Sequence, residues 1–452
     1  MKFSYAFFGL FVCLFVSCSN GELFSSTTEP PETTDTTEVE SDSTEESESA
    51  EQEDSQSTAP APDSDSNTDS EQNVDSENAE LTEITDVTES TSQDLAECAV
   101  DVHLHFNSNI TFASGATQLL EKMATLQIGD ETGLSLALLQ PPPTPCPLCD
   151  GVHYTYEDNM TPSLETIVDQ NATKFGLVAG GGELSPIIHA AVVGSVAPTT
   201  AQIDTFRQQA ESLVADGVLA FGEMAALHLS FVDEHPFIQM PADHAYFLAL
   251  AEVAAQKSVP IDIHLEAVNR TSFTLPDDMP KMPDGKSCFK TIAEGGNNPT
   301  MVNENITAFK ALLTHNYETA VSLGDASRAK IVWSHVGWDN TGDLSPTLVK
   351  ELLTAHPNLY ASLKMLDSVG PCQVVAHRPL DENGELQDDW NQLFEEFPDR
   401  FVLGSDEFTG NAQSITADSA SLQGTWNLIA KLPEAIAYKF ACENPRLIYN
   451  IE

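Results

Sequence analysis

Two patterns of hydrophobic and polar positions alternate along the chain from residue 98 to residue 452. One is a short run rich in Val, Ile and Leu, which is typical of a buried strand. The other is a longer stretch in which apolar residues recur at helical spacing. Strands are predicted over residues 99–106, 134–139, 175–179, 218–223, 260–266, 330–335, 359–363 and 401–406. Helices are predicted over residues 116–126, 164–171, 201–216, 244–257, 302–321, 346–355, 387–397 and 420–430.

Repeats of one strand and one helix indicate βαβ units with parallel strands. Eight such units favour an α/β fold in the form of a (β/α)8 TIM barrel over residues 98–452. An open doubly wound sheet is the alternative, but no glycine-rich phosphate-binding turn follows the first predicted strand. In a barrel, functional residues gather at the C-terminal ends of the strands. Two long loops, 140–162 and 269–300, leave such ends and are expected to wall the substrate site.

The first predicted strand carries two histidines two positions apart, His103 and His105. Side chains alternate between the faces of a strand, so these two imidazoles point to the same face, and Val102 and Leu104 point to the other. Two imidazoles on one face can hold the same metal ion. A His-x-His pair occurs often by chance, so the assignment depends on what the other strands carry.

Four more potential ligands lie at or near the C-terminal ends of later strands. Glu223 ends the fourth strand, His264 lies late in the fifth, His335 ends the sixth and Asp406 ends the eighth. Closure of a barrel brings the eighth strand beside the first, which places Asp406 next to the histidine pair. Each of these residues also has an ordinary structural interpretation, such as an N-cap or a buried ion pair. Together they predict a metal site in the mouth of the barrel.

The first 18 residues look like an export signal. Lys2 precedes an apolar run over residues 7–16, which is shorter than the ~20 residues that a membrane span needs. The residues before Cys18 resemble a bacterial lipoprotein processing site, with Phe15 where Leu is usual. An ordinary secretory signal is the alternative. We therefore expect an exported lipoprotein, anchored to the membrane only through a lipid on Cys18 and facing the periplasm or the cell exterior.

Residues 19–97 contain 25 Asp or Glu and no Lys or Arg, among many Ser, Thr and Pro. Such a segment buries too little apolar surface to offset the entropy lost on ordering, so a disordered acidic tether is expected. The formal net charge of the whole chain is −51, of which −27 belongs to residues 98–452. An excess of acidic residues argues against a nucleic-acid partner, because phosphate contacts need clustered Lys and Arg. A small-molecule substrate fits better.

Six cysteines remain once Cys13 and Cys18 of the signal are set aside. In an exported protein an even number of cysteines suggests disulfide bonds, here with 15 possible pairings. Cys146 and Cys149 form a CxxC motif, typical of a redox pair or half of a zinc knuckle, but no second CxxC completes a four-cysteine zinc site. Structural disulfides are the favoured interpretation, with the pairing left open.

The set of potential ligands resembles that of the amidohydrolase superfamily of metal-dependent hydrolases. The resemblance rests on the His-x-His pair of the first strand, a carboxylate on the fourth, histidines on the fifth and sixth, and Asp on the eighth. It covers residues 98–452, and the segment 443–447 looks like the closing segment of that family. Many relatives have a carboxylated lysine on the fourth strand, whereas this chain has Glu223, as in the glutamate-bearing branches.

The resemblance implies a role for each ligand. His103, His105 and Asp406 would bind the first metal, and Asp406 would also accept a proton from the attacking water. Glu223 would bridge two metals. His264 and His335 would hold the second one. In the one-metal branches His264 joins the first site and His335 polarises the substrate, so the number of metals stays open.

The chemistry of the ligands agrees with this resemblance. Imidazole and carboxylate ligands suit Zn²⁺, with Mn²⁺ or Fe²⁺ as alternatives. A bound metal acidifies water and polarises the bond under attack, and a carboxylate such as Asp406 can move the proton. We therefore expect an enzyme that hydrolyses an ester, lactone or amide bond of a small molecule. A non-oxidative decarboxylase and a non-catalytic binding protein are the alternatives.

Other polar residues near the strand ends have less certain roles. Glu266 shares a strand face with His264 and is expected to orient a ligand, to contact the substrate or to form a plain salt bridge. A decarboxylase needs a cation for the carboxylate of its substrate, for which Lys364 and Arg270 are the candidates. Trp338 is expected to wall an apolar pocket or to cover the barrel. His228, His235 and His377 are expected to face solvent in loops.

Overall fold

The structure is a computed structural model that describes residues 95–106, 111–144, 155, 162–231, 236–275, 277–279, 289–315, 328–365, 376–409 and 421–452. The predicted signal over 1–18, and all but the last three residues of the predicted tether over 19–97, lie outside the described residues. The same holds for His235 and for the cysteines at positions 13, 18, 146, 149, 288 and 372. No helix among the described residues is long and apolar enough to cross a membrane.

All eight predicted strands are present in the structure. In chain order they are β1 (Val100–Phe106), β4 (Leu136–Leu139), β5 (Phe175–Gly180), β6 (Ala220–His228), β8 (Ile261–Leu265), β11 (Ile331–Val336), β12 (Leu359–Leu363), and an eighth strand in two halves, β13 (Phe401–Leu403) and β14 (Glu407–Thr409). Short strands decorate the loops: β2 (Gln127–Ile128) pairs with β3 (Glu131–Thr132), β7 (Ile238–Gln239) pairs with β6, and β9 (Ser272–Thr274) pairs with β10 (Met301–Asn303).

The main sheet closes on itself through its eighth strand. Its order is β13-β12-β11-β8-β6-β5-β4-β1-β14, and all neighbours on this path are parallel. The half-strand β13 pairs with β12, whereas β14 pairs with β1. Between the halves, the N–H of Gly404 donates to the carbonyl of Leu363 (3.1 Å) and the N–H of Asp406 donates to the carbonyl of His103 (2.8 Å). The predicted TIM barrel is therefore confirmed.

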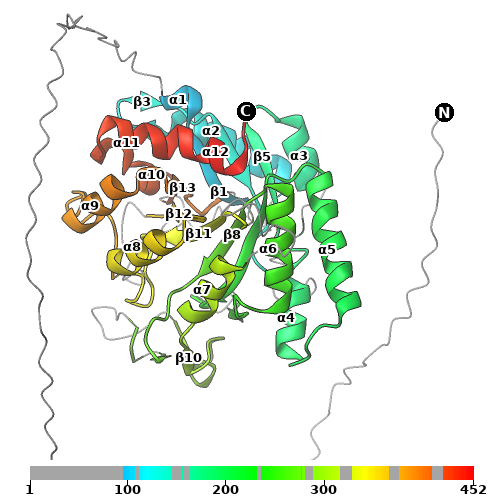
Figure 1. The fold of residues 1–452 in the computed structure, drawn as a ribbon. Helices are drawn as coiled ribbons and strands as arrows, with labels where there is room; N and C mark the ends of the chain where they lie inside the picture. Colours follow the sequence, from blue (N-terminus) through cyan, green and yellow to red (C-terminus); the bar gives the residue numbers. More distant parts are fainter. Residues whose placement is uncertain are drawn as a thin grey trace, which may run out of the picture. The chain divides into compact units, whose positions relative to one another are not determined.

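Helices cover the outside of this barrel (Figure 1). They are α1 (Leu95–Cys98), α2 (Phe112–Thr125), α3 (Leu164–Gln170), α4 (Ser185–Val193), α5 (Thr200–Ala215), α6 (Ala245–Lys257), α7 (Ile306–Thr314), α8 (Pro346–Ala355), α9 (Asp388–Glu396), α10 (Ser421–Trp426), α11 (Glu434–Tyr438) and α12 (Asn444–Tyr449). Single turns of 3-10 helix lie at Ile292–Glu294 and Ile429–Lys431, and a π-helical turn lies at Lys439–Glu443. Local sequence sets several starts: the Thr199 and Gln202 side chains form a capping box at α5.

One predicted helix has different bounds in the structure, and two helical segments were not predicted. The helix predicted over 302–321 starts later, at Ile306, because Val302 pairs with Phe273 in the β9–β10 ladder. It ends at Thr314, and residues 316–327 lie outside the described residues. The hydrophobic pattern did not indicate α4, nor the helical segment over residues 434–449. That last segment matters because two of its residues enter the barrel.

Buried apolar side chains form two separate clusters. The larger one lies between the strands and the helices. The smaller one fills the barrel, with residues from six strands and from α12: Val100, Val102, Leu138, Val178, Ala220, Val332, Val402, Ile448 and Tyr449. The Tyr449 hydroxyl donates to Oδ1 of Asp262 on β8 (2.8 Å). The end of the chain therefore closes the floor of the barrel, opposite the mouth.

One disulfide bond joins the two ends of the folded part. Cys98, just before β1, is bonded to Cys442 in the C-terminal helical segment, 344 residues later. This confirms that structural disulfides are present and supplies a pairing that the sequence left open.

Candidate active site

The two histidines of β1 point together into the mouth of the barrel. Nε2 of His103 lies 3.1 Å from Nε2 of His105, and both side chains are buried. The prediction that Val102 points to the opposite face is wrong, because Val102 belongs to the inner cluster. The pairing of β1 with β4 shifts register between Asp101 and Leu104, so alternation is broken at this point. A bulge of this kind lets neighbouring residues both face inward.

The ring of His105 is held in one orientation by the backbone. Its Nδ1 lies 2.8 Å from the carbonyl oxygen of Gln140, so Nδ1 carries the hydrogen and donates it. Nε2 is then the nitrogen that faces the mouth, where it lies 3.3 Å from Oε2 of Glu223 and 3.2 Å from Oδ1 of Asp406. This arrangement is the one that metal-binding histidines usually adopt.

Glu223 is the centre of the site, and its two oxygens face different pairs of histidines. Oε2 lies 3.4 Å from Nε2 of His103 and 3.3 Å from Nε2 of His105. Oε1 lies 2.6 Å from Nδ1 of His264 and 3.0 Å from Nε2 of His335. The carboxylate is almost fully buried, with the residue 2% exposed.

His264, on β8, lies between two buried carboxylates. Its Nδ1 faces Glu223, and its Nε2 lies 3.1 Å from Oε2 of Glu266. Glu266 is itself fixed, because both of its oxygens accept from the N–H of Leu229 (3.2 Å each). Glu266 therefore orients His264, one of the roles that the sequence suggested for it.

His335 and Asp406 both have left-handed backbone conformations, with φ of 65° and 53°. Such values are uncommon outside glycine and often mark functional sites. Asp406 presents Oδ1 to His105, and its Oδ2 accepts a short hydrogen bond from the Lys364 ammonium. The Lys364 ammonium also lies 5.2 Å from the centre of the Trp338 ring. Lys364 thus contacts a site residue, and Trp338 lies beside it.

Proton affinities in the cluster are shifted far from their ordinary values. Burial lowers the pKa of His105 and of His264, but nearby carboxylates outweigh it and raise them to about 9 and about 10. Burial, with smaller effects from His264 and His103, outweighs the two carboxylates and lowers the pKa of His335 to about 3. Burial would raise the pKa of Glu223 and Asp406, yet the surrounding imidazoles and, for Asp406, the Lys364 ammonium hold both well below their usual range. Both carboxylates are ionised at neutral pH.

These residues fit a divalent metal ion. One ligand atom from each of His103, Glu223, His335 and Asp406 lies within 4.8 Å of the others, and Nε2 of His105 adjoins three of them. Imidazole nitrogens and carboxylate oxygens that converge in a buried space need either protons or a cation between them. The residues could therefore bind a metal. All six residues singled out in the sequence come together, with His264 on the far side of Glu223.

The prediction that His228 faces solvent is wrong, and Arg270 and His377 have partners that the sequence did not indicate. His228 does not face solvent: it is 6% exposed and its ring lies 4.7 Å from that of His264, between centroids. Arg270 is paired with Asp343 through three hydrogen bonds, so it is held at the rim by that carboxylate. His377 is only partly exposed and pairs with Asp339. Sequence pattern alone missed these partners because each is distant in the chain.

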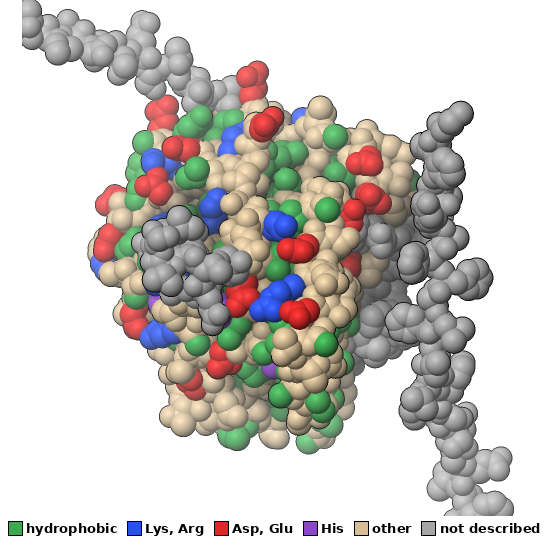
Figure 2. Space-filling view, turned by 45° about the vertical axis from the view of Figure 1, so that its right-hand side comes forward, with side chains coloured by type: hydrophobic (Ala, Val, Ile, Leu, Met, Phe, Trp, Pro, Cys, Tyr) green, Lys and Arg blue, Asp and Glu red, His purple; other side chains and the backbone are tan. Residues whose placement is uncertain are grey.

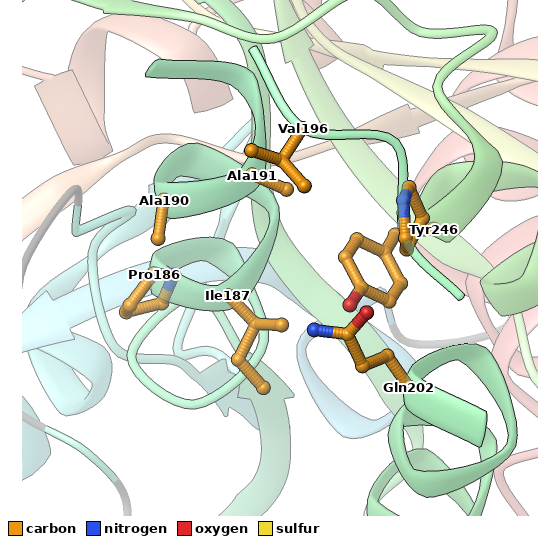
Figure 3. A pocket seen from close by; sticks show the side chains of 8 residues that line it. Pro186, Ile187, Ala190, Ala191, Val196, Gln202 and Tyr246 are labelled. Atoms are coloured by element: carbon orange, nitrogen blue, oxygen red, sulfur yellow. The ribbon is translucent and has the colours of Figure 1, made fainter. Parts of the chain in front are cut away.

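A separate apolar pocket of about 490 Å³ lies away from this cluster, between α4, α5 and α6. In Figure 3 the side chains of Ile187, Ala190 and Val196 line one side, and those of Gln202 and Tyr246 line the other. Its lining includes none of the six clustered residues. Over the face drawn in Figure 2, basic and acidic side chains lie next to each other.

No family model and no curated protein matches the sequence. Among solved structures, the chain is similar to one titled probable 2-pyrone-4,6-dicarboxylic acid hydrolase from Acinetobacter baumannii (9% identity, 78% of this chain and 99% of that chain, TM-score 0.36). It is also similar to 2,6-dihydroxybenzoate decarboxylase (11%, 79% and 99%, 0.41) and to 4-oxalomesaconate hydratase from Rhodopseudomonas palustris (12%, 78% and 96%, 0.39).

Structures titled as amidohydrolases also match, at 10% and 12% identity. Sequence identities of 9–12% and TM-scores of 0.36–0.41 indicate a similar fold and do not identify the reaction. The barrel is thus similar to solved amidohydrolase-type structures, the group that its sequence motifs resemble.

Proposed function

We propose that this protein is a metal-dependent hydrolase that cleaves an ester, lactone or amide bond of a small molecule. The observation that carries the proposal is the orientation of Glu223. One of its oxygens faces His103 and His105, and the other faces His264 and His335. A buried carboxylate placed between two pairs of imidazoles is suited to bridge two metal ions, as in the two-metal sites of hydrolases.

The ligands of the first metal would be His103, His105 and Asp406, and those of the second would be His264 and His335, with Glu223 shared. The alternative is one metal held by the compact set of His103, Glu223, His335 and Asp406. Zn²⁺ is the favoured ion, because nitrogen and carboxylate ligands of this kind suit it. A divalent metal in this site supplies positive charge that polarises the bond to be cleaved and acidifies water.

The chain's own residues supply positioning and proton transfer. Asp406 accepts a proton from the attacking water, since it is ionised and lies at the mouth. Gln140 and Glu266 fix the rings of His105 and His264. His335 stays neutral across the ordinary pH range, because burial holds its pKa at about 3. Burial of the cluster excludes bulk water, which strengthens each of these interactions.

Export and a lipid anchor at Cys18 belong to the same proposal, with a small molecule as the partner and no nucleic acid. The Cys98–Cys442 disulfide supports a location outside the cytoplasm, because such bonds persist in oxidising compartments. A decarboxylase on the same barrel is the second candidate. It needs a cation for the substrate carboxylate, and the two candidates for that role, Lys364 and Arg270, are paired with Asp406 and Asp343. That pairing favours hydrolysis.

The test is metal content per chain, measured by mass spectrometry on the purified protein. We expect two equivalents of a zinc-like metal in the wild type, about one fewer in Glu223→Gln, and a large loss in His103→Ala/His105→Ala. His244→Ala is the control, because His244 is a histidine outside the cluster, at the N-cap of α6. Its replacement should leave the metal content unchanged. Loaded protein is then screened with esters, lactones and amides, and with aromatic carboxylates for release of carbon dioxide. Absence of metal after reconstitution would overturn the proposal, and carbon dioxide release without hydrolysis would replace it with the second candidate.

A further inference from the structure

A second pairing of a histidine with a carboxylate lies on the loops that follow β11 and β12. Nδ1 of His377 lies 2.6 Å from Oδ2 of Asp339. The Asp339 side chain is fully buried, whereas that of His377 is 36% exposed. Neither residue belongs to the cluster of six described above. The pair combines a fixed carboxylate with a histidine that solvent and small molecules can reach.

The two carboxylate oxygens of Asp339 accept hydrogen bonds from different partners. Oδ1 accepts from the N–H of Gly342 (2.8 Å) and from the N–H and hydroxyl of Thr341 (3.1 and 3.2 Å). Oδ2 is left for the imidazole of His377. Because Oδ2 accepts, Nδ1 of His377 carries the hydrogen, and Nε2 is the nitrogen turned away from the carboxylate. Within the part of the chain that the structure describes, Nε2 makes no hydrogen bond. A carboxylate that fixes one ring nitrogen leaves the other ready for proton transfer.

The two loops that carry this pair leave the C-terminal ends of β11 and β12, so the pair lies on the mouth side of the barrel. Asp339 follows His335 by four residues, and the N–H of Trp338 donates to the carbonyl of His335 (2.9 Å). The loop of His377 lies against this turn. A Cβ atom on Gly337 would come within 2.9 Å of Pro379, two residues after His377. The loop of His377 therefore packs against the turn that follows His335, and the N–H of Ala376 donates to the carbonyl of Asp339 (3.1 Å).

A chain of contacts continues from this turn to Asp406. The Trp338 ring lies beside Lys364, and Lys364 donates to Oδ2 of Asp406. Both oxygens of Asp406 are thus engaged, one facing His105 and one facing Lys364. A separate group that gives a proton to the leaving atom would leave Asp406 to handle the proton of the attacking water.

The charges around His377 favour its protonated form. The hydrogen bond to Asp339 raises the pKa of His377, partial burial opposes this, and Asp389 and Asp343 raise it further. The acidic groups that act on His377 are Asp339, Asp389 and Asp343, and Arg270, which is paired with Asp343, is a basic group nearby. At neutral pH a larger share of His377 carries a proton than of an isolated histidine.

We propose that His377, oriented by Asp339, is the general acid that protonates the leaving group in the hydrolysis proposed above, on which this inference rests. For an ester, the bond between the acyl carbon and the leaving oxygen breaks, and its electron pair stays on that oxygen. The oxygen takes the proton from Nε2 of His377, while the oxygen of the attacking water bonds to the acyl carbon and one of its protons passes to Asp406. The imidazole regains its proton from solvent. The favoured substrates are then esters, lactones or amides whose leaving groups are unactivated alcohols or amines.

The test compares two esters with the same acyl group in the metal-loaded, full-length protein. Ethyl butyrate has a poor leaving group that needs a proton, whereas 4-nitrophenyl butyrate has one that leaves without help. For His377→Gln we expect kcat/KM to fall about 100-fold on the ethyl ester and to change little on the nitrophenyl ester, with metal content unchanged. The alkaline limb of the pH profile for the ethyl ester should also disappear. Arg378→Gln, on the same loop, is the control and should match the wild type on both esters.

His377→Ala provides a second variant, because added imidazole should restore part of the activity on the ethyl ester. An equal loss on both esters, or no loss on either, would overturn the role of His377 while leaving the proposed hydrolase intact. Hydrolysis of neither ester by the metal-loaded wild type, together with no activity on lactones or amides, would overturn both proposals. These two failures are distinguished by the wild-type rates alone.

Discussion

Lys364 donates a hydrogen bond to Oδ2 of Asp406, on the side of that carboxylate that faces away from His105. The two residues come from the ends of neighbouring strands, β12 and the segment between β13 and β14. The ammonium is among the groups that keep the pKa of Asp406 well below its usual range. A cation placed this way keeps the proton acceptor ionised.

Replacement of Lys364 should therefore change the acid limb of the pH–rate profile. In Lys364→Met the pKa of Asp406 rises, so activity should be lost at a higher pH than in the wild type as the pH falls. Lys364→Arg keeps the charge and is the matched control. Steady-state rates from pH 4 to pH 9 check this. If the acid limb lies at the same pH in all three proteins, Lys364 does not lower the pKa of the group that controls activity.

The metal-free protein should lose stability at alkaline pH. His105 and His264 have pKa values raised to about 9 and about 10 by neighbouring carboxylates, against about 6.5 in an unfolded chain. A raised pKa of a base stabilises the fold fully below about pH 6.5, and this stabilisation is lost as the pH rises through 9 to 10. Thermal melting of chelator-treated protein should show a falling Tm over that range.

Metal loading should reduce the fall of Tm with rising pH, because the same imidazole nitrogens are then held by the metal. His264→Gln should reduce it in part, whereas His244→Ala, outside the site, should not. A Tm that falls equally in loaded and metal-free protein would mean that these pairs do not control alkaline stability.

The Cys98–Cys442 disulfide should contribute strongly to stability. It links positions 344 residues apart, and long loops gain most from a cross-link in the chain-entropy description. We expect Cys98→Ser, Cys442→Ser and the double variant to lose about 2–5 kcal/mol of unfolding free energy alike. Urea denaturation with and without a reductant measures this. A reductant should lower the wild type to the level of the variants and leave the variants unchanged.

The buried Asp262 should be a site where asparagine stabilises the protein. Burial, with a smaller effect from Glu223, outweighs the hydrogen bond from Tyr449 and raises the pKa of Asp262 well above its ordinary value, so the folded protein binds a proton there more readily than the unfolded chain does. Stability from such a group is present at low pH and is lost as the pH rises above about 4. The asparagine of Asp262→Asn does not titrate. The free energy of unfolding of this variant, measured with urea, should therefore exceed that of the wild type by an amount that grows from pH 4 to pH 7. A constant difference would contradict this.

Tyr449→Phe serves as the comparison for that variant. It removes the hydroxyl that donates to Asp262 and leaves a buried polar group without that partner, so it should destabilise the protein by roughly 1–3 kcal/mol.

Much of the barrel could be predicted because the local sequence of each strand is enough to indicate it. Residues 331–333 are β-branched or aromatic and are followed by polar Ser334 and the ligand His335, and a similar change from apolar to polar marks Glu223 and Asp406. Because parallel strands end at one face of a barrel, the position of each ligand along its own strand was enough to place all of them in one mouth.

The contacts around those ligands depend on the folded geometry. The inward position of Val102 next to His103 comes from a register shift against β4, which the sequence of β1 does not encode by itself. The pairing of His377 with Asp339 joins two loops 38 positions apart. The start of the helix predicted over 302–321 was wrong for a related reason. Val302 pairs with Phe273 in a short antiparallel ladder and is therefore part of a strand.

The floor of the barrel is made by α12, which lies outside the strands that form the ring. Ile448 and Tyr449 fill the centre of the ring. The inner core therefore forms only when α12 packs against strands that lie far from it in the sequence. Deletion of α12 would remove the floor while leaving every proposed ligand in the chain, so a variant without it would lose activity through the barrel interior and not through the ligand set.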